Sequence, residues 1–279
     1  MVKLSKIYEL ADSIAPKKLS DELCERYNHY DNSGILVDCG EEIKGMVFSL
    51  DLSNAAIDKA LSTGANLIMT HHPAIYGKIG SIRYDDGALL GGKLIRCIKN
   101  GISVLSMHLN LDAAKDGIDE SLMEGVLLAA EKTTGAGTGR IAECKEAAAY
   151  MQTVSEGGYG RAYDLPKIEL SSLVENMKTV FSTERIEVYG NGKQLTRVAS
   201  FCGAGADEGS IAFAKRMGAD VIISSDFKHH LIALAQESGL AIVSLTHFAS
   251  ETYGFKKYYE KIRRQTEIPC VYHTDGNLL

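Results

Sequence analysis

The sequence predicts an α/β protein made of two similar halves, each with a mixed, largely parallel sheet. Short apolar runs rich in Val, Ile, Leu and Met alternate with amphipathic segments of helical period, which is typical of α/β architecture. The chain has 279 residues and 45% hydrophobic side chains, enough for one large domain or two. An internal repeat, described below, favours two domains over one.

Each apolar run predicts a strand, and each periodic segment predicts a helix. We expect strands at 45–51, 65–71, 102–108, 197–203, 219–225 and 240–245. We expect helices near 4–14, 53–63, 89–99, 117–130, 207–217, 228–237 and 249–264. Ser53, Asn54 and Asp207 lie at or near the starts of two of these helices, where side-chain oxygens can accept from backbone N–H groups that lack helical partners.

The repeat is visible when the chain is compared with itself. Residues 60–71 (ALSTGANLIMTH) match residues 214–225 (AKRMGADVIISS), and each copy continues with a helix and a second strand. The second strand leads to His108-x3-Asp112 in one copy and to His247-x3-Glu251 in the other.

We therefore expect one α/β half at 1–130 and another at 131–279, facing each other. A less regular segment is expected at about 131–190, where Gly-rich stretches at 133–140 and 155–163 predict turns or hairpin loops.

Composition excludes several classes of function. The net charge of −6, without any run of Lys and Arg, argues against a nucleic-acid groove and against an anionic membrane surface. Six cysteines scattered singly predict reduced thiols inside a cell. The first residues carry charges throughout a helical pattern, unlike a signal peptide, and no stretch approaches the ~20 apolar residues that span a bilayer. We expect a cytoplasmic protein.

A pair of histidines ends the second predicted strand. His71 and His72 follow a buried run and precede Pro73, which stops ladder pairing and keeps His72 extended. Ligands of open α/β sheets bind beyond the carboxyl ends of the strands. Neighbouring strand residues point to opposite faces, so the two imidazoles would address two points, such as two metal ions. The alternative is one core histidine and one surface histidine.

Two further elements repeat this chemistry. His108 ends a predicted strand with Asp112 just beyond it, whereas Asp116 is better explained as a cap of the next helix. His247 and Glu251 lie one helical turn apart if the helix begins where the strand ends, and this spacing lets two side chains share one ion. An ordinary surface pair is the alternative for these two residues.

The joint placement of these elements favours a metal site. Imidazoles and carboxylates suit borderline divalent ions, namely Zn, Fe, Mn, Co or Ni, and the lack of Cys ligands argues against a closed structural zinc site. A carboxylate such as Glu251 can bridge two ions ~3.5–4 Å apart and a water between them becomes acidic.

These residues resemble a known family, the Nif-three-like dinuclear metal-centre hexameric proteins, also known as GTP cyclohydrolase I type 2 homologs. The motifs that carry the resemblance span nearly the whole chain: YDNSGILV (30–37), LIMTHHPAIYG (67–77), MHLNLDAAKDGI (107–118), RVASFCGAGAD (197–207), SSDFKHH (224–230) and SLTHFASE (244–251). The resemblance implies metal ligation by His71, His72, Asp112, His247 and Glu251, with Glu251 bridging and His108 nearby. It also implies a toroidal homohexamer with the metal sites facing an internal cavity.

The leading functional hypothesis is a metal-dependent hydrolase that acts on a small molecule, with His108, His230 or Lys228 moving protons or stabilising charge. His229 and His230 are equally well explained as an exposed helix start. No P-loop marks a guanine nucleotide site. The turn 203–207 could hold an anion, but a tight strand-to-helix connection is the better explanation. Two alternatives are a non-catalytic metal-binding or regulatory assembly and a partner-binding adaptor.

Overall fold

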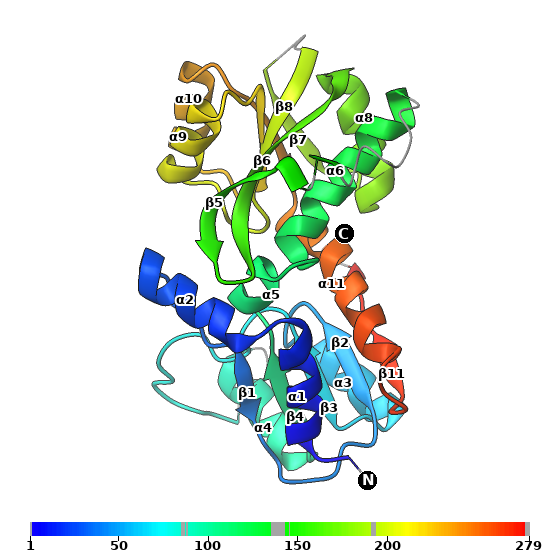
Figure 1. Cartoon of the computed structure of the whole chain (residues 1–279). Helices are drawn as coiled ribbons and strands as arrows, with labels where there is room; N and C mark the ends of the chain where they lie inside the picture. The colour runs from blue at the N-terminus through cyan, green and yellow to red at the C-terminus, as the bar shows by residue number, and fades with distance from the viewer. Residues whose placement is uncertain are drawn as a thin grey trace. The chain divides into compact units, whose positions relative to one another are not determined.

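The structure is a computed structural model that describes residues 2–84, 87, 89–134, 143–144, 146–190 and 194–276. Contacts divide these residues into two compact units. Unit 1 comprises the described residues of 1–114, Val154–Glu156 and those from Phe255 onward, and unit 2 comprises the rest. Each unit is built around its own sheet (Figure 1).

Unit 1 contains a five-stranded sheet of order β1-β4-β3-β2-β11. Its strands are β1 (Gly34–Val37), β2 (Met46–Ser49), β3 (Leu67–Thr70), β4 (Ser103–Ser106) and β11 (Cys270–Tyr272). Its helices are α1 (Leu4–Ile14), α2 (Lys17–Tyr27), α3 (Asn54–Thr63), α4 (Leu90–Lys99) and α5 (Leu109–Ala113). Strands β11, β2, β3 and β4 are parallel, and only β1 is antiparallel to its neighbour among these described strands.

Both faces of this sheet are buried by apolar side chains. On one face, Val47, Ile68 and Val104 from successive strands pack in a core cluster with side chains of α3 and α4. On the other face, the ring of Phe48 lies 6.2 Å from that of Phe255 and 6.4 Å from that of Tyr258, both from the second half of α11 (His247–Arg263). Burial on both faces explains why the strands read as continuous apolar runs.

Unit 2 contains a six-stranded sheet of order β5-β6-β8-β9-β10-β7. Its strands are β5 (Ala149–Val154), β6 (Gly157–Glu169), β7 (Ile186–Tyr189), β8 (Gln194–Ser200), β9 (Val221–Ser225) and β10 (Ala241–Leu245). Its helices are α6 (Ile118–Thr134), α8 (Leu170–Phe181), α9 (Glu208–Arg216), α10 (His229–Glu237) and the first turns of α11. Strands β8, β9 and β10 are parallel, whereas β6 and β7 are antiparallel to their neighbours β8 and β10.

Helices cover both faces of the unit 2 sheet, as Figure 1 shows. Ile211 of α9 and Leu231 of α10 join Ala199 and Ile222 of the sheet in a core cluster on one face. Helices α6 and α8 pack against each other and against β6 on the other face. A buried ion pair crosses this layer, because the guanidinium of Arg161 on β6 contacts the carboxylate of Asp119 on α6 and both side chains are fully buried.

The predicted α/β class with mostly parallel sheets is confirmed, and so are the six predicted strands and seven predicted helices, with shifts of a few residues at their ends. Ser53 caps α3 by accepting from Ala56 N, and Asp207 caps α9 by accepting from Ser210 N. Asn54 is the first residue of α3 rather than its cap. The repeat is confirmed as β3-α4-β4 in unit 1 and β9-α10-β10 in unit 2, each with a parallel strand pair.

The middle of the chain contains more strand than expected. The stretch 155–163, expected as turns or hairpin loops, contains the turn Ser155–Glu156 between β5 and β6, but the rest of it belongs to the long strand β6. This strand pairs with β8 from Arg161 to Glu169, with a register shift between Asp164 and Ile168. The stretch is rich in glycine, which is typical of turns, but here a glycine is required inside the strand. The backbone at Gly160 lies so close to the ring of Phe201 that no side chain fits there. Residues 135–140 of the other Gly-rich stretch lie outside the described residues.

Two more expectations concern the chain as a whole. The domain boundary at residue 130 stays a prediction, since the contact units do not test which segments fold as domains. Within the described part of the chain, no helix is both long enough and apolar enough to cross a membrane.

Candidate metal-binding residues

The candidate residues of unit 1 lie where three neighbouring parallel strands end. The last residues of β2, β3 and β4, which are Ser49, Thr70 and Ser106, are paired in register. Asp51, His71, His72 and His108 follow these strands within two residues. Strand β1 runs the opposite way, with Gly34 opposite Ser106, so Asp31 before β1 reaches the same edge. The strand register therefore gathers side chains that are far apart in the sequence.

His71 is fully buried and held in one orientation. Its Nδ1 lies 2.8 Å from the carbonyl oxygen of Met107, which can only accept, so Nδ1 carries the proton and Nε2 has the lone pair. This Nε2 lies 3.5 Å from Oδ1 of Asp112, which is 4% exposed. Two ligands that each stand ~2.1 Å from one tetrahedral ion are ~3.4 Å apart, so this spacing fits a shared metal ion.

His72 and His108 are each oriented by a carboxylate. Nδ1 of His72 lies 2.8 Å from Oδ1 of Asp51, and Nδ1 of His108 lies 2.8 Å from Oδ1 of Asp31. Burial alone would raise the pKa of Asp31, but hydrogen bonds from His108, Ser20 and Ser33 outweigh it and hold this pKa well below its usual range. A carboxylate on Nδ1 directs Nε2 toward a metal and makes it a stronger ligand.

The expected strand alternation of His71 and His72 is wrong. Strand β3 ends at Thr70, and the backbone N–H groups of both histidines donate to the carbonyl of Leu50 instead of continuing the ladder. Their rings lie 4.9 Å apart at an interplanar angle of 45°, and the rings of His71 and His108 lie 5.3 Å apart. One ligand atom from each of His71, His108 and Asp112 can be chosen so that all three lie within 4.8 Å of one another. His108 is thus a potential ligand in its own right.

The candidate residues of unit 2 lie at the equivalent edge. Helix α11 begins at His247, two residues earlier than expected, so His247 and Glu251 do face each other across one helical turn. Nε2 of His247 is 3.1 Å from Oε1 of Glu251, and its Nδ1 is 2.5 Å from Oδ2 of Asp226, the residue after β9. Glu251 is 3% exposed. The same carboxylate–imidazole–ligand order therefore recurs in this unit.

A glycine gives the Glu251 carboxylate its space. Gly203 follows β8 with φ of +57°, and a Cβ there would overlap Oε1 of Glu251. The N–H of Gly203 donates to Ser250 Oγ at 3.2 Å, while its carbonyl accepts from Ser225 N at 3.2 Å. Gly203 thus leaves room for the Glu251 side chain, and the turn 203–207 leads to the Asp207 cap of α9.

The remaining residues singled out from the sequence are Lys228, His229, His230 and Asp116, and no hydrogen bond or ion pair described above links them to the candidate ligands. Lys228 precedes α10, whose first residues are His229 and His230, and all three are exposed. This is the exposed helix start that was the alternative for the two histidines. The N–H of Asp116, in a left-handed conformation with φ of +55°, donates to Glu120 at 3.2 Å.

Sequence reasoning missed the three carboxylates that orient the imidazoles: Asp31, Asp51 and Asp226. Each lies at a strand end on the same sheet edge as its histidine. Asp31 falls inside the 30–37 motif and Asp226 inside the 224–230 motif, so a signal for both was present. A search for acidic residues beside predicted strand ends would have found the third, Asp51.

Comparison with known proteins assigns the family. The family described as Duf34/NIF3 (NGG1p interacting factor 3) matches residues 2–275. This chain belongs to the DUF34/NIF3 family. Among relatives, the NIF3-family protein is 30% identical over 269 residues to a "GTP cyclohydrolase 1 type 2 homolog" of Clostridium perfringens, covering 95% of this chain and 93% of the relative. A protein of the same name from Methanocaldococcus jannaschii is 29% identical and covers 97% and 98%.

Solved structures of the family share the fold. The structure "Reduced HcgD from Methanocaldococcus jannaschii" aligns with a TM-score of 0.77 at 26% identity, covering 97% of each chain. A Bacillus cereus protein related to NIF3 aligns with a TM-score of 0.75 at 20% identity, covering 98% of this chain and 97% of that one. The predicted family is confirmed, and the His, Asp and Glu groups described above could bind metal.

Proposed function

We propose that this NIF3-family protein binds two divalent metal ions and uses them to hydrolyse a small cytoplasmic substrate. The proposed ligands are His71, His72, Asp112, His247 and Glu251, with Glu251 bridging. The ions are of the borderline class, namely Zn, Fe, Mn, Co or Ni. The observation that carries the proposal is the orientation of the imidazoles: those of His71, His72, His108 and His247 each have Nδ1 on a carboxylate or carbonyl oxygen.

This orientation is what metal ligation requires. In most metal sites a histidine donates its other ring N–H to a carboxylate or carbonyl, which fixes the tautomer and raises the basicity of the ligand nitrogen. Four histidines that served only to pack a core would not all need an oxygen acceptor on Nδ1. When bound, two divalent ions supply an acidified water and polarise the bond under attack.

Residues beside the proposed ligands would then move protons. His108 with Asp31 forms a pair that could accept a proton and stabilise the resulting charge, because Asp31 stays ionised. His230 and Lys228 remain in the proposal as exposed groups at the start of α10 that could move protons or stabilise charge. Fully buried His71 is confined to ligation.

The substrate class is suggested by relatives alone. Several carry the name GTP cyclohydrolase 1 type 2 homolog, and a Helicobacter pylori relative, 24% identical over 253 residues, is named GTP cyclohydrolase 1 type 2. A nucleotide or another phosphorylated compound is therefore the first substrate to test.

Metal content tests the ligand set. We expect two ions per chain in the wild-type protein by elemental analysis, and fewer in the variants His72→Ala and Glu251→Ala. His229→Ala is the matched control, because this exposed imidazole lies outside the proposed ligand set. Equal metal content in all four proteins would refute the ligand assignment.

Turnover separates the hydrolase from its alternatives. The metal-quantified protein should hydrolyse at least one member of a panel of nucleotides, phosphoesters and cyclic amides, and both ligand variants should lose that activity. Two bound ions without turnover would instead favour a non-catalytic metal-binding or regulatory assembly. Stoichiometric capture of a protein partner in the absence of metal would favour the adaptor.

We also propose that the protein assembles as a homohexamer. The segment between β3 and α4 exposes Tyr76, Ile79, Ile82, Tyr84 and Leu89, of which Tyr84 is 75% exposed. Such a concentration of exposed apolar side chains is typical of a surface covered by another subunit. Light scattering should give six times the chain mass, and Ile82→Glu should reduce it. Leu61→Glu, on α3 of the same unit, should not.

A further inference from the structure

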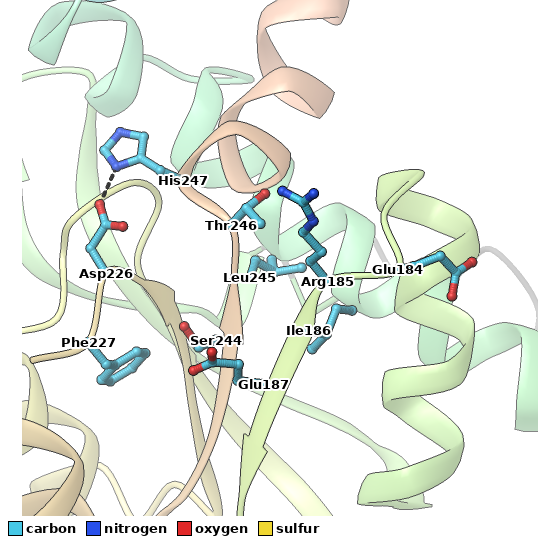
Figure 2. A pocket seen from close by; sticks show the side chains of 10 residues that line it. All are labelled: Glu184, Arg185, Ile186, Glu187, Asp226, Phe227, Ser244, Leu245, Thr246 and His247. Carbon is cyan, nitrogen blue, oxygen red and sulfur yellow. Dashed lines mark hydrogen bonds and ion pairs between the residues drawn. The ribbon is translucent and has the colours of Figure 1, made fainter. Parts of the chain in front are cut away.

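A pocket of about 580 Å³ opens at the sheet edge of unit 2 beside His247. It lies beyond the carboxyl ends of the parallel strands β9 and β10, the position at which open α/β sheets bind ligands. Strand β7 begins at the same edge, since Ile186 pairs with Leu245, and this places Arg185 on the rim. Figure 2 shows the Arg185 side chain rising beside Thr246, with His247 on the far side of Thr246.

Two of the three carboxylates that line this pocket lie beside a basic side chain, and the third accepts a hydrogen bond from a neutral hydroxyl. Asp226 contacts His247, Glu187 accepts from the hydroxyl of Tyr189 at 3.0 Å, and Glu184 lies 3.9 Å from Nζ of Lys178. Glu184 also points away from the pocket in Figure 2. The guanidinium of Arg185 has no ion pair or hydrogen bond with any residue that the structure describes.

Two hydroxyl groups complete a donor set. Oγ1 of Thr246 accepts from Ala249 N at 3.1 Å, which leaves its O–H to donate. Ser244 is 9% exposed, and its hydroxyl has no partner within the described residues. Ser244 lies in β10 and Thr246 is the first residue after this strand, and both line the pocket. A guanidinium with two hydroxyls is a donor set for an oxyanion.

We infer that this pocket binds the phosphate or carboxylate group of a small ligand through Arg185, Thr246 and Ser244. The ring of Phe227 supplies an apolar wall on the opposite side, as Figure 2 shows. A ligand anchored in this way would present its remaining atoms toward His247. Its role as a substrate subsite rests on the proposed hydrolase, whereas the binding of the anion does not.

Titration with inorganic phosphate tests the inference. Phosphate-31 NMR of the full chain, both stripped of metal and loaded with Zn²⁺, should show saturable binding in the wild-type protein. Arg185→Gln should weaken it at least about ten-fold in both forms, because a charge-assisted hydrogen bond is lost. Arg216→Gln is the matched control. Arg216 is an exposed arginine of unit 2 that lies over Phe213 and outside the pocket.

The outcomes separate the two proposals. Equal phosphate affinity in Arg185→Gln and wild type overturns the pocket assignment, whatever the metal content. Arg185-dependent binding to the metal-free protein supports the pocket even if no turnover is found. Competition by acetate would assign a carboxylate ligand, and its absence a phosphate ester. If turnover is found, Arg185→Gln should raise KM with little change in kcat, because Arg185 anchors the ligand.

Discussion

The internal repeat relates two strand pairs, β3 and β4 in unit 1 and β9 and β10 in unit 2. Different residues follow these strands in the two units. In unit 1, His71 and His72 follow β3, while in unit 2 the matching positions hold Ser225 and Asp226. Asp226 orients an imidazole instead of being one. One copy thus carries several imidazoles, and the other combines a single imidazole with a buried glutamate.

The support of the two edges differs as well. In unit 1, hydrogen bonds between strand ends hold the turn after β3: Thr70 Oγ1 lies 2.6 Å from Ser106 Oγ, which accepts from Ala74 N at 3.1 Å. In unit 2, Cys202 N donates to the buried Asp119 at 3.1 Å, and Asp119 is held by Arg161. The same strand topology thus supports candidate metal ligands either through neutral hydrogen bonds or through a buried ion pair.

The largest loss of unfolding free energy should come from breaking the buried Arg161–Asp119 ion pair of unit 2. Arg161→Leu leaves the carboxylate of Asp119 buried without its cation, and such a loss costs about 3–5 kcal/mol of unfolding free energy. Arg197→Leu is the control, because its partner Asp164 is 68% exposed and surface pairs contribute about 0–1 kcal/mol. Urea denaturation measures both. Equal losses would mean that the buried pair does not support this edge.

Gly203 tests how tightly unit 2 encloses Glu251. Gly203→Ala combines a left-handed backbone with overlap on Glu251, so we expect it to cost about 1–3 kcal/mol more than Gly218→Ala. Gly218 has a similar φ of +69°, but a Cβ there meets nothing within 4 Å. If the two variants have the same melting temperature, the turn has room that the structure does not show.

The orienting carboxylates offer a direct comparison of the two edges. Asp51→Asn in unit 1 and Asp226→Asn in unit 2 should each lower metal affinity by about 10–100-fold, if the proposed ligands are correct. Competition with a chelating dye measures the affinity. Asp58→Asn should have no effect, because its carboxylate pairs with Arg96 on the surface. A loss in only one of the two variants would show that only one edge holds metal.

The smallest effects should come from the helix caps that precede β3 and β9. Ser53→Ala removes one hydrogen bond to Ala56 N and should cost about 1 kcal/mol. Asp207→Ala should cost slightly more, because Asp207 and Ser210 form a reciprocal capping box. Thermal unfolding of the two variants would rank them, and the opposite order would contradict the stronger cap in unit 2.

Sequence patterns predicted the parts of this molecule that depend on local order. Apolar runs located the parallel strands, and polar residues after them located His71, His72, Asp112, His247 and Glu251. The edge strands β1, β5, β7 and β11 and the antiparallel strand β6 were missed. The edge strands are short and partly exposed, and the pairing of β1, β7 and β11 depends on distant segments. Helix α2 was missed too, because only Leu19 and Leu23 among its large apolar side chains are buried.

The carboxylates that orient the imidazoles were not predicted, because their positions also depend on strand pairing between distant segments. Asp51 meets His72 because β2 and β3 are paired in one register, and Asp31 meets His108 because β1 runs antiparallel to β4. A shift of the register would separate these pairs. The register between two strands that are distant in the sequence depends on both strands together and is not read from either one alone. The parallel order of the strands can be inferred from sequence, but the partner of each imidazole requires the structure.

Strand β11 has a consequence for biosynthesis. It pairs with β2, although Cys270–Tyr272 is the last strand along the chain and β2 one of the first. A nascent chain therefore keeps β2 as an open edge while the whole of unit 2 is being translated, and open edges pair readily with other chains. Ribosome stalling or truncation before Cys270 should yield aggregation-prone fragments, even though every candidate metal ligand has already been made.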